Sequence, residues 1–202
     1  MPVCVYCQEN AHYRDRQSGQ YLCPAHARVE IVSSDGGCAS MPSLTLRSAT
    51  AADAPAIVRL ADYFWGETEV ECFGLSYRVD SLEAFVACDG AHVAGVLAYA
   101  VEEDRLNIVM LNVLPGYQGR GAALGLLERA RAEANRLSLG HLAAATSNDD
   151  LPALHLYPRW GFRITRVQCG QLIEHHGGEE VGFGGVVVRD EIQLVYDLIP
   201  GR

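Results

Sequence analysis

The sequence predicts an α/β protein of the α+β type, in which helices flank a mostly antiparallel sheet and a small zinc-binding module precedes it. Three observations predict this. Two Cys/His pairs stand in the first 26 residues, three strand-like runs follow one another over residues 84–113, and a glycine-rich turn leads into a helical pattern after residue 121. The pattern divides the chain into a metal module (1–32), a linker (33–43) and a main domain (44–202).

Composition narrows the classes of partner. The chain has 202 residues, a hydrophobic content of 49% and a net charge of −9, so one sizeable core is expected and nucleic acid is a poor partner. Cationic small molecules suit the acidic surface better. The apolar runs are too short to cross a bilayer, and the start MPVCVYCQEN has no signal-peptide pattern. We therefore expect a cytoplasmic protein with no membrane partner.

The first thirty residues carry metal-ligand spacing. Cys4 and Cys7 form one pair, Cys23 and His26 form the other, and each pair has the two-residue gap common in zinc sites. Four ligands close a tetrahedral shell, which predicts a structural zinc ion, and so short a segment needs a metal to fold. Incidental thiols are the alternative. Residues 11–22 between the pairs predict a small hairpin, and 33–43 reads as a Ser/Gly-rich linker. The other cysteines are scattered without a disulfide pattern: Cys38, Cys72, Cys88 and Cys169.

The main domain opens with a strand, a helix capped by Thr50, an acidic loop and a three-stranded antiparallel meander. The first strand is expected at 44–47, the helix at 50–65 and the acidic loop at 67–71. The three strands of the meander are expected at 84–88, 92–101 and 106–113. Its second half predicts a helix, a strand, a short helix capped by Asp149 or Asp150, a strand, a glycine-rich loop and a last strand. The helix is expected at 124–137, the strand at 141–146, and the short helix ends at Tyr157. The next strand is expected at 160–167, the glycine-rich loop at 175–185 and the last strand at 191–198. Leu124 and Leu137 are expected on the buried face of the first of these helices.

The glycine-rich turn "LPGYQGRGAALG", residues 114–125, predicts an anion site. A turn before a helix presents backbone N–H groups beside the positive end of the helix dipole. No lysine follows Gly119 or Gly121, which excludes a nucleotide-triphosphate loop, and the third glycine of a dinucleotide-binding turn is missing.

Two motifs resemble those of the GNAT superfamily of acyl-CoA-dependent N-acyltransferases, over about residues 44–200. The signature Gln/Arg-x-x-Gly-x-Gly/Ala is met at residues 118–123, and Ala-x-x-x-Tyr-x-x-x-Gly-Phe is met at residues 153–162. The resemblance implies a mixed, mostly antiparallel sheet, acetyl-CoA as cosubstrate and strands 106–113 and 141–146 that separate to admit the pantetheine arm. It also implies a set of cofactor-binding residues: Val113, Gln118, Gly119, Arg120, Gly121, Ala122, Ala123, Asn148, Asp150 and Tyr157.

The resemblance further implies the catalytic groups. Tyr157 stands where the family places its general acid, with simple packing against pantetheine as the alternative. Glu191 begins the last strand, which borders the acceptor cleft in this fold, with a solvated surface charge as the alternative. Asp150 departs from the asparagine usual in the similar bacterial subgroup, and an ionised carboxylate cannot donate a hydrogen bond. Strand 106–113 has no carboxylate to act as base, only Asn107 and Asn112.

The sequence therefore predicts an acetyl-CoA-dependent N-acetyltransferase that acts on a primary amine of a small-molecule or peptide acceptor. The alternative is a catalytically weak acyl-CoA-binding regulatory module that docks a protein partner through its zinc knuckle. A homodimer is compatible with either hypothesis.

Overall fold

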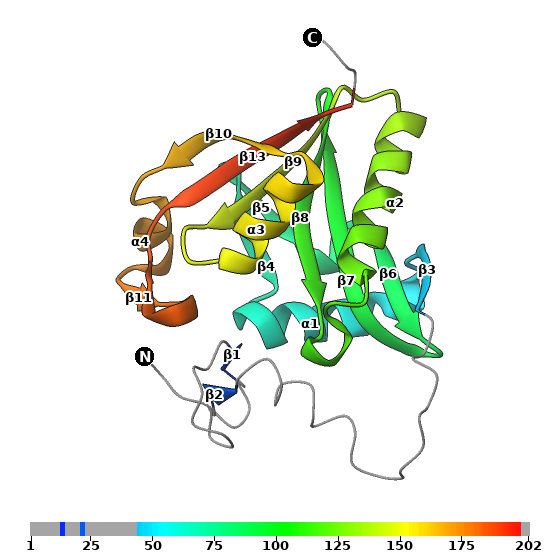
Figure 1. Ribbon diagram of the computed structural model, residues 1–202, viewed down its shortest axis with the longest axis horizontal. Coiled ribbons are helices and arrows are strands. Elements are labelled where there is room, and N and C mark those ends of the chain that lie inside the picture. The colour runs from blue at the N-terminus through cyan, green and yellow to red at the C-terminus, as the bar shows by residue number, and fades with distance from the viewer. Residues whose placement is uncertain (1–12, 15–20, 23–43, 199–202) are drawn as a thin grey trace.

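The computed structural model describes residues 13–14, 21–22 and 44–198 (Figure 1). The short strands β1 (Tyr13–Arg14) and β2 (Tyr21–Leu22) pair antiparallel, as the predicted hairpin requires. The four predicted zinc ligands and the predicted linker lie outside the described residues. No helix in the described part of the chain is long and apolar enough to cross a membrane.

A seven-stranded sheet forms the centre of the main domain, in the order β10-β13-β9-β8-β7-β6-β3. Every neighbouring pair is antiparallel except β8 and β9, which run parallel. The sheet is thus mixed and mostly antiparallel, as predicted. Its strands are β3 (Thr45–Ser48), β6 (Glu83–Asp89), β7 (His92–Glu102), β8 (Arg105–Val113), β9 (His141–Ser147), β10 (Arg163–Gln168) and β13 (Glu191–Asp197).

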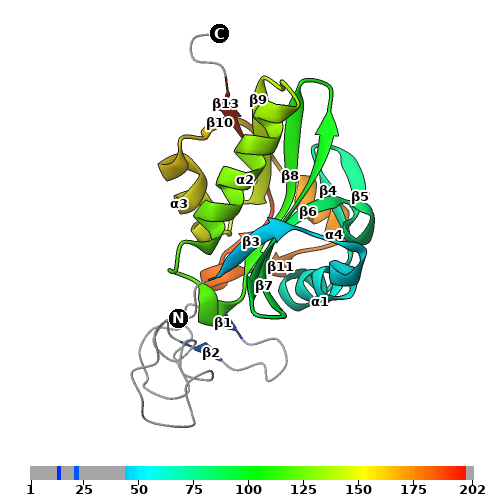
Figure 2. The ribbon, with the colours of Figure 1, turned by 90° about the vertical axis from the view of Figure 1, so that its right-hand side faces the viewer.

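Helices cover both faces of this sheet (Figure 2). On one face, which we call the α2 face, α2 (Ala122–Arg136) and α3 (Leu151–Trp160) bury Leu106 and Leu126 among other apolar side chains. On the other, the α1 face, α1 (Ala54–Trp65) packs Ile57 against Val86 and its neighbours. Because both faces are covered, the central strands read as near-continuous apolar runs.

The start of α1 is fixed by charge and capping. The Asp53 carboxylate accepts hydrogen bonds from the Thr50 backbone N–H and hydroxyl, both at 2.8 Å, and from both terminal nitrogens of Arg47 on β3. A short 3₁₀ turn at Ala51–Asp53 precedes the α-helix, and Gly66 in the left-handed region (φ 75°) ends it. Thr50 therefore opens the helical segment, as its residue type predicts.

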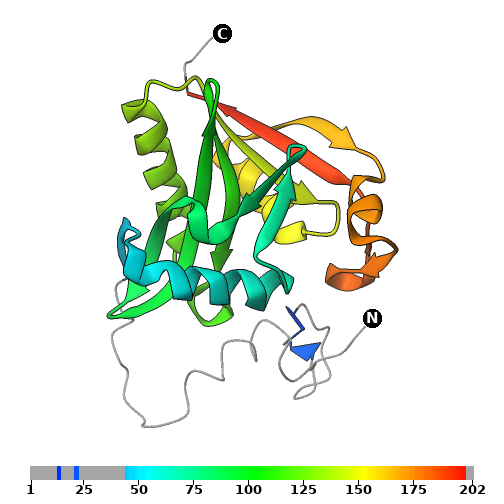
Figure 3. The same cartoon turned by 180° about the vertical axis from the view of Figure 1, so that it is seen from behind.

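The prediction of an acidic loop at residues 67–71 is wrong. The structure forms a hairpin here, β4 (Glu69–Cys72) and β5 (Leu75–Arg78), joined by Phe73 and Gly74, which both have positive φ. Val70 and Cys72 alternate with the glutamates and turn toward the α1 face of the sheet. The hairpin lies over that face beside α1 (Figure 3). The sequence predicts a loop here because Glu67, Glu69 and Glu71 are typical of a solvated segment.

Two further expectations are corrected. The predicted loop at 175–185 overlaps regular elements: α4 (Gln171–His176), β11 (Glu180–Val181), a 3₁₀ turn (Phe183–Gly185) and β12 (Val187–Val188). Leu124 in α2 and Leu137, the residue that follows it, are exposed at 49% and 37%, while Leu126 is fully buried. Because the helix begins at Ala122, the buried stripe runs through positions 122, 126, 127, 130 and 134.

Candidate active site

The parallel strands β8 and β9 separate halfway along their length (Figure 1). Their pairing runs from Arg105 opposite His141 to Ile108 opposite Ala144 and stops there. At the same point the register of β8 against β7 shifts, so that Val109 is the extra residue of a β-bulge. A bulge bends its strand and increases the local twist. The bulge therefore accounts for the predicted separation of strands 106–113 and 141–146.

Backbone groups of β8 face this separation. Leu114 donates its N–H to the Ala94 carbonyl of β7 at 2.8 Å, so these two residues form a hydrogen-bonded pair. The alternation of an antiparallel ladder then turns the N–H and C=O of Val113, and of Leu111 two residues before it, away from β7. The Val113 carbonyl accepts a hydrogen bond from the Gln118 side chain at 2.9 Å. The two N–H groups can bind an extended ligand along the unpaired strand.

The glycine turn after β8 forms an anion site. It contains the 3₁₀ turn Pro115–Tyr117 and passes through Gly119 and Gly121, with φ of 71° and 82°. The Gly121 carbonyl accepts the first helical hydrogen bond of α2, from Gly125, so the N–H groups of residues 122–124 have no helical partner, whereas the Gln118 N–H donates to the Pro115 carbonyl at 3.3 Å. No side chain caps this end of α2 and no acidic residue occupies its first turn. A Cβ at Gly121 would meet no protein atom within 4 Å.

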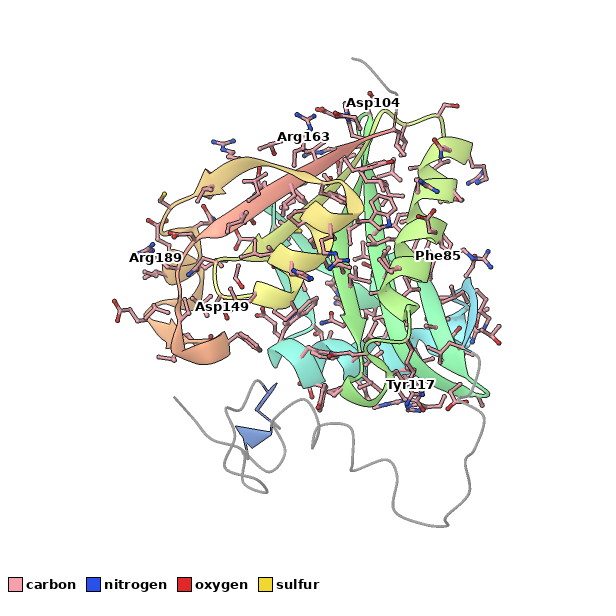
Figure 4. The ribbon with its side chains drawn as sticks, in the orientation of Figure 1. Phe85, Asp104, Tyr117, Asp149, Arg163 and Arg189 are labelled. Carbon is pink, nitrogen blue, oxygen red and sulfur yellow. The ribbon has the colours of Figure 1, made fainter. Side chains whose placement is uncertain are left out.

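Arg120, in the same turn, lies over an aromatic ring. Its guanidinium carbon is 5.2 Å from the centroid of Tyr117, and the Tyr117 hydroxyl donates to Asp89 at 3.0 Å. Figure 4 shows Tyr117 just below the start of α2. The cation thus lies beside the uncapped helix end and adds to its positive potential.

Tyr157 reaches the site from α3. Asp150 caps this helix as predicted: its carboxylate accepts the Ala153 N–H and the Thr146 hydroxyl, both at 3.1 Å. Tyr157 stands two turns later and is 5% exposed, with its ring 5.0 Å from that of Phe162. Burial, and secondarily the charge of Asp150, raises the pKa of the Tyr157 phenol well above its usual range. The phenol therefore keeps its proton at neutral pH.

The β4–β5 hairpin packs against β8 at the point of separation, on the face opposite α3. Cys72 belongs to the β4–β5 hairpin on the α1 face, where it packs with Val109 at the bulge, whereas Tyr157 belongs to the core of the α2 face. Burial, with a further contribution from Glu191, raises the pKa of the Cys72 thiol to about 12. The α1 side of the bulge thus carries a neutral thiol, with the Glu191 carboxylate near it.

A family model described as the acetyltransferase (GNAT) family matches residues 51–162. The chain belongs to this family. The match covers the meander, the glycine turn and α3 up to Phe162, and thus both sequence motifs of the predicted cofactor site.

Curated relatives of this GNAT chain cover parts of it. An uncharacterized protein of Bacillus subtilis, YxbD, is 28% identical over 104 residues, which are 51% of this chain and 64% of the relative. A streptothricin acetyltransferase of Streptomyces lavendulae is 37% identical over 87 residues, 42% of this chain and 43% of the relative. The matches thus span less than two thirds of the length of either relative.

Solved structures share the fold along almost their whole length. An IAA acetyltransferase from Bacillus cereus superposes with a TM-score of 0.63 at 24% identity, covering 77% of this chain and 99% of that one. An acetyltransferase from Elizabethkingia anophelis with acetyl-CoA bound gives a TM-score of 0.60 at 18% identity, covering 78% and 99%. A Bacillus subtilis acetyltransferase in complex with CoA gives 0.58 at 21%, covering 77% and 99%. The GNAT fold of residues 44–198 is thereby confirmed.

Within this GNAT fold, the carboxylate of Glu191 lies at the end of the β4–β5 hairpin. Glu191 is the first residue of β13 and is 5% exposed. Its Oε2 accepts the Phe73 backbone N–H at 3.2 Å, and its Oε1 accepts from the Gln193 side chain at 2.7 Å. The structure therefore brings the predicted catalytic carboxylate beside Cys72, with a hydrogen bond to each of its oxygens.

Asn148 and Asp149 connect the loop after β9 to the segment before β13. The Asn148 amide donates to the Val187 carbonyl and accepts the backbone N–H groups of Arg189 and Asp190. Asp149 is 7% exposed and accepts the Phe183 N–H at 2.8 Å. Figure 4 shows Asp149 near the start of α3. The contact of Asn148 with a cofactor stays a prediction; within the chain its amide holds residues 187–190 in place.

The α1 face of β8 carries two asparagines near the separation. Asn107 is fully buried and donates to the Tyr77 hydroxyl at 3.4 Å. Within the described part of the chain, the Oδ1 atoms of Asn107 and Asn112 are buried without a hydrogen-bond partner. β8 thus offers amide oxygens on this face, as its sequence predicted, and no carboxylate.

Proposed function

We propose that this GNAT chain is an acetyl-CoA-dependent N-acetyltransferase that transfers the acetyl group to a primary amine. One arrangement carries the proposal: the separation of β8 and β9 leads directly to the uncapped N-terminus of α2. A long ligand with an extended arm and an anionic group fits such a path. The alternative of a regulatory module draws no support from the family or the relatives.

Cofactor binding follows from backbone groups. The N–H groups of residues 119–123 and the positive end of α2 would hold the pyrophosphate, with Arg120 adding charge beside it, while Gln118 contributes through its side chain on the Val113 carbonyl. The pantetheine arm would lie along β8 and accept a hydrogen bond from the Val113 N–H, in the place that β9 leaves unpaired. The open space at Gly121 supports a close approach of the ligand to the backbone.

Acyl transfer needs a neutral amine, a donor to the thioester carbonyl and a proton for the leaving thiolate. The amine nitrogen attacks the thioester carbon, the C–S bond breaks, and the Tyr157 hydroxyl gives its proton to the departing sulfur. The N–H of Leu111 or Val113 would stabilise the negative charge that develops on the carbonyl oxygen. Because β8 has no carboxylate, the proton released by the amine would leave through water.

Calorimetric titration with acetyl-CoA tests cofactor binding. In Gly121→Val the new side chain points into the space where the pyrophosphate would lie, so the dissociation constant should rise about tenfold or more. Gly170→Val is the matched control, because Gly170 also precedes a helix with positive φ (78°) and open space. Equal affinity in the two variants would contradict the assigned pyrophosphate site.

The acceptor can be tested by measuring CoA release with a panel of amines. We propose a cationic primary amine, because the net charge of −9 attracts cations and because one relative is named a streptothricin acetyltransferase. Streptothricin is therefore the first probe, followed by polyamines and basic peptides. Turnover with none of these amines, in a protein that binds acetyl-CoA, would refute the proposed acceptor class.

We also propose that residues 1–32 form a zinc-binding module ahead of a linker (33–43) and the acyltransferase domain (44–202). The support is the spacing of Cys4, Cys7, Cys23 and His26. Elemental analysis of the purified protein should find about one zinc per chain, and Cys4→Ser should lower this content. A zinc content that does not change in Cys4→Ser would contradict the ligand set.

A further inference from the structure

The β4–β5 hairpin is held at its turn by contacts from two strands of the main sheet. Phe73, at the turn, has φ of 56°, which a phenylalanine adopts only where its surroundings fix it. Its N–H donates to Glu191 on β13 at 3.2 Å, and its ring lies 5.1 Å from the guanidinium carbon of Arg105 on β8. A two-stranded hairpin is marginally stable alone, so these contacts determine where its turn lies.

The position of this turn matters because of what lies beside it. Cys72, the last residue of β4, packs with Val109 at the bulge of β8, immediately after the last residue that pairs with β9. The hairpin thus covers the α1 face of the sheet at the place where the acyl group would be held, opposite the general acid on the α2 face. An amine that approaches from the α1 face must pass along this hairpin.

The Glu191 carboxylate is engaged rather than free. One oxygen accepts the Phe73 N–H and the other accepts the Gln193 side chain, and the group is 5% exposed. In Glu191→Gln the single amide oxygen can still accept the Phe73 N–H, and the new NH2 group can donate to the Gln193 side-chain oxygen once the Gln193 amide turns over. The role visible in the geometry therefore depends on the length and acceptor capacity of the side chain, not on its basicity.

We propose that Glu191 is a positioning residue: by accepting the Phe73 N–H, it fixes the β4–β5 hairpin as the wall of the acceptor-amine site. This inference rests on the proposed acetyltransferase function for its kinetic consequence, and on the structure alone for the contact. Loss of the contact raises the KM for the amine, while the affinity for acetyl-CoA and the proton transfer by Tyr157 remain.

Three substitutions separate positioning from general-base catalysis. Glu191→Gln keeps the length and an acceptor oxygen but cannot take up a proton at neutral pH. Glu191→Asp keeps the base but draws the oxygens back by one methylene, about 1.5 Å. Glu191→Ala removes both. Glu83→Gln, on an exposed position of β6, is the matched control for the loss of one charge.

Hydrogen exchange of peptides from residues 69–78 reports on the contact without any acceptor. We expect wild-type protection in Glu191→Gln and Glu83→Gln, and about tenfold faster exchange in Glu191→Asp and Glu191→Ala. Protection that is unchanged in both Glu191→Asp and Glu191→Ala would overturn the proposal. Because exchange needs no turnover, this result stands even if the acetyltransferase proposal fails.

Steady-state kinetics with acetyl-CoA and streptothricin as the amine probe are the second test of the positioning role. Positioning predicts that Glu191→Gln matches the wild type in kcat and in its pH profile, while Glu191→Asp and Glu191→Ala raise the amine KM about tenfold with kcat changed less than threefold. The reverse order, with Asp active and Gln losing kcat and the acidic limb of its pH profile, would identify Glu191 as the base. Absence of wild-type turnover with this probe counts against the proposed acceptor alone.

Discussion

Replacement of Tyr157 by phenylalanine removes one hydroxyl from the proposed acyl site and leaves the ring. The ring is 5% exposed and packs 5.0 Å from Phe162, and phenylalanine preserves this packing. We therefore expect the free energy of unfolding to change by less than about 1 kcal/mol. The dissociation constant for acetyl-CoA should also stay within about twofold, because the proposed cofactor contacts come from the backbone of β8 and of the glycine turn.

The rate should fall much more than the affinity. General acid catalysis contributes about 10²–10⁴-fold, so kcat in Tyr157→Phe should fall at least about a hundredfold, or about 2.7 kcal/mol in barrier height. Single-turnover measurement of CoA release at saturating amine isolates this step. Tyr196→Phe is the matched control, because Tyr196 belongs to the same aromatic cluster around Phe162 and Trp160.

The pH dependence follows from the direction of the pKa shift. Burial favours the neutral phenol, so the pKa of Tyr157 lies above its ordinary value of about 10 and the proton stays on the hydroxyl throughout the neutral and mildly alkaline range. The wild-type kcat should therefore show no alkaline decline between about pH 7 and 9.5 from this group. A kcat in Tyr157→Phe within threefold of the wild type would refute the general-acid assignment and leave Tyr157 as a packing residue.

Three further substitutions test how the site is supported. Asp53→Ala removes the acceptor of four hydrogen bonds and should cost about 2 kcal/mol in denaturant unfolding at pH 7. Because Arg47 holds the pKa of Asp53 well below its usual range, this contribution is present above about pH 4 and is lost as the pH falls further. Asp150→Asn keeps a capping oxygen and removes a buried charge whose pKa is raised by burial, so thermal unfolding should show a gain in stability at pH 7 that fades as the pH falls toward about 4 and is absent below it. Gly182→Ala places a Cβ against the Asp149 carboxylate and should lower the free energy of unfolding by about 1–3 kcal/mol, whereas the open Gly178→Ala should not.

The sequence predicted the elements that local rules determine. Thr50, Asp150 and the glycines around residue 120 each have a conformational role that depends on near neighbours, and the structure confirms all three. The three apolar runs of the meander also form antiparallel strands as predicted, because short apolar runs separated by turns are typical of buried strands. Local chemistry was sufficient at these positions.

The hairpin at 69–78 was missed because its role depends on distant residues. Glu69 and Glu71 are typical of a solvated loop, and the alternation of Val70 with Cys72 is too short to outweigh them. The Glu191 carboxylate accepts the N–H at its turn from 118 positions away in the sequence. Propensity could not anticipate a strand that a remote side chain stabilises.

The separation of β8 from β9 could be expected from the motifs, but its physical cause lies outside the strand itself. Nothing in the run Leu106–Val113 marks Val109 as a bulge, since every residue around it is apolar or amidic and suits a regular strand. At the bulge, two consecutive residues face the α1 side: Val109 packs with Cys72 and Tyr77 of the hairpin, and Met110 packs in the core beneath α1. Pairing with β9 ends at Ile108, immediately before the bulged residue. The hairpin that the sequence analysis missed therefore packs against the bulge where the predicted cofactor path begins, and Glu191 accepts a hydrogen bond from the turn of that hairpin.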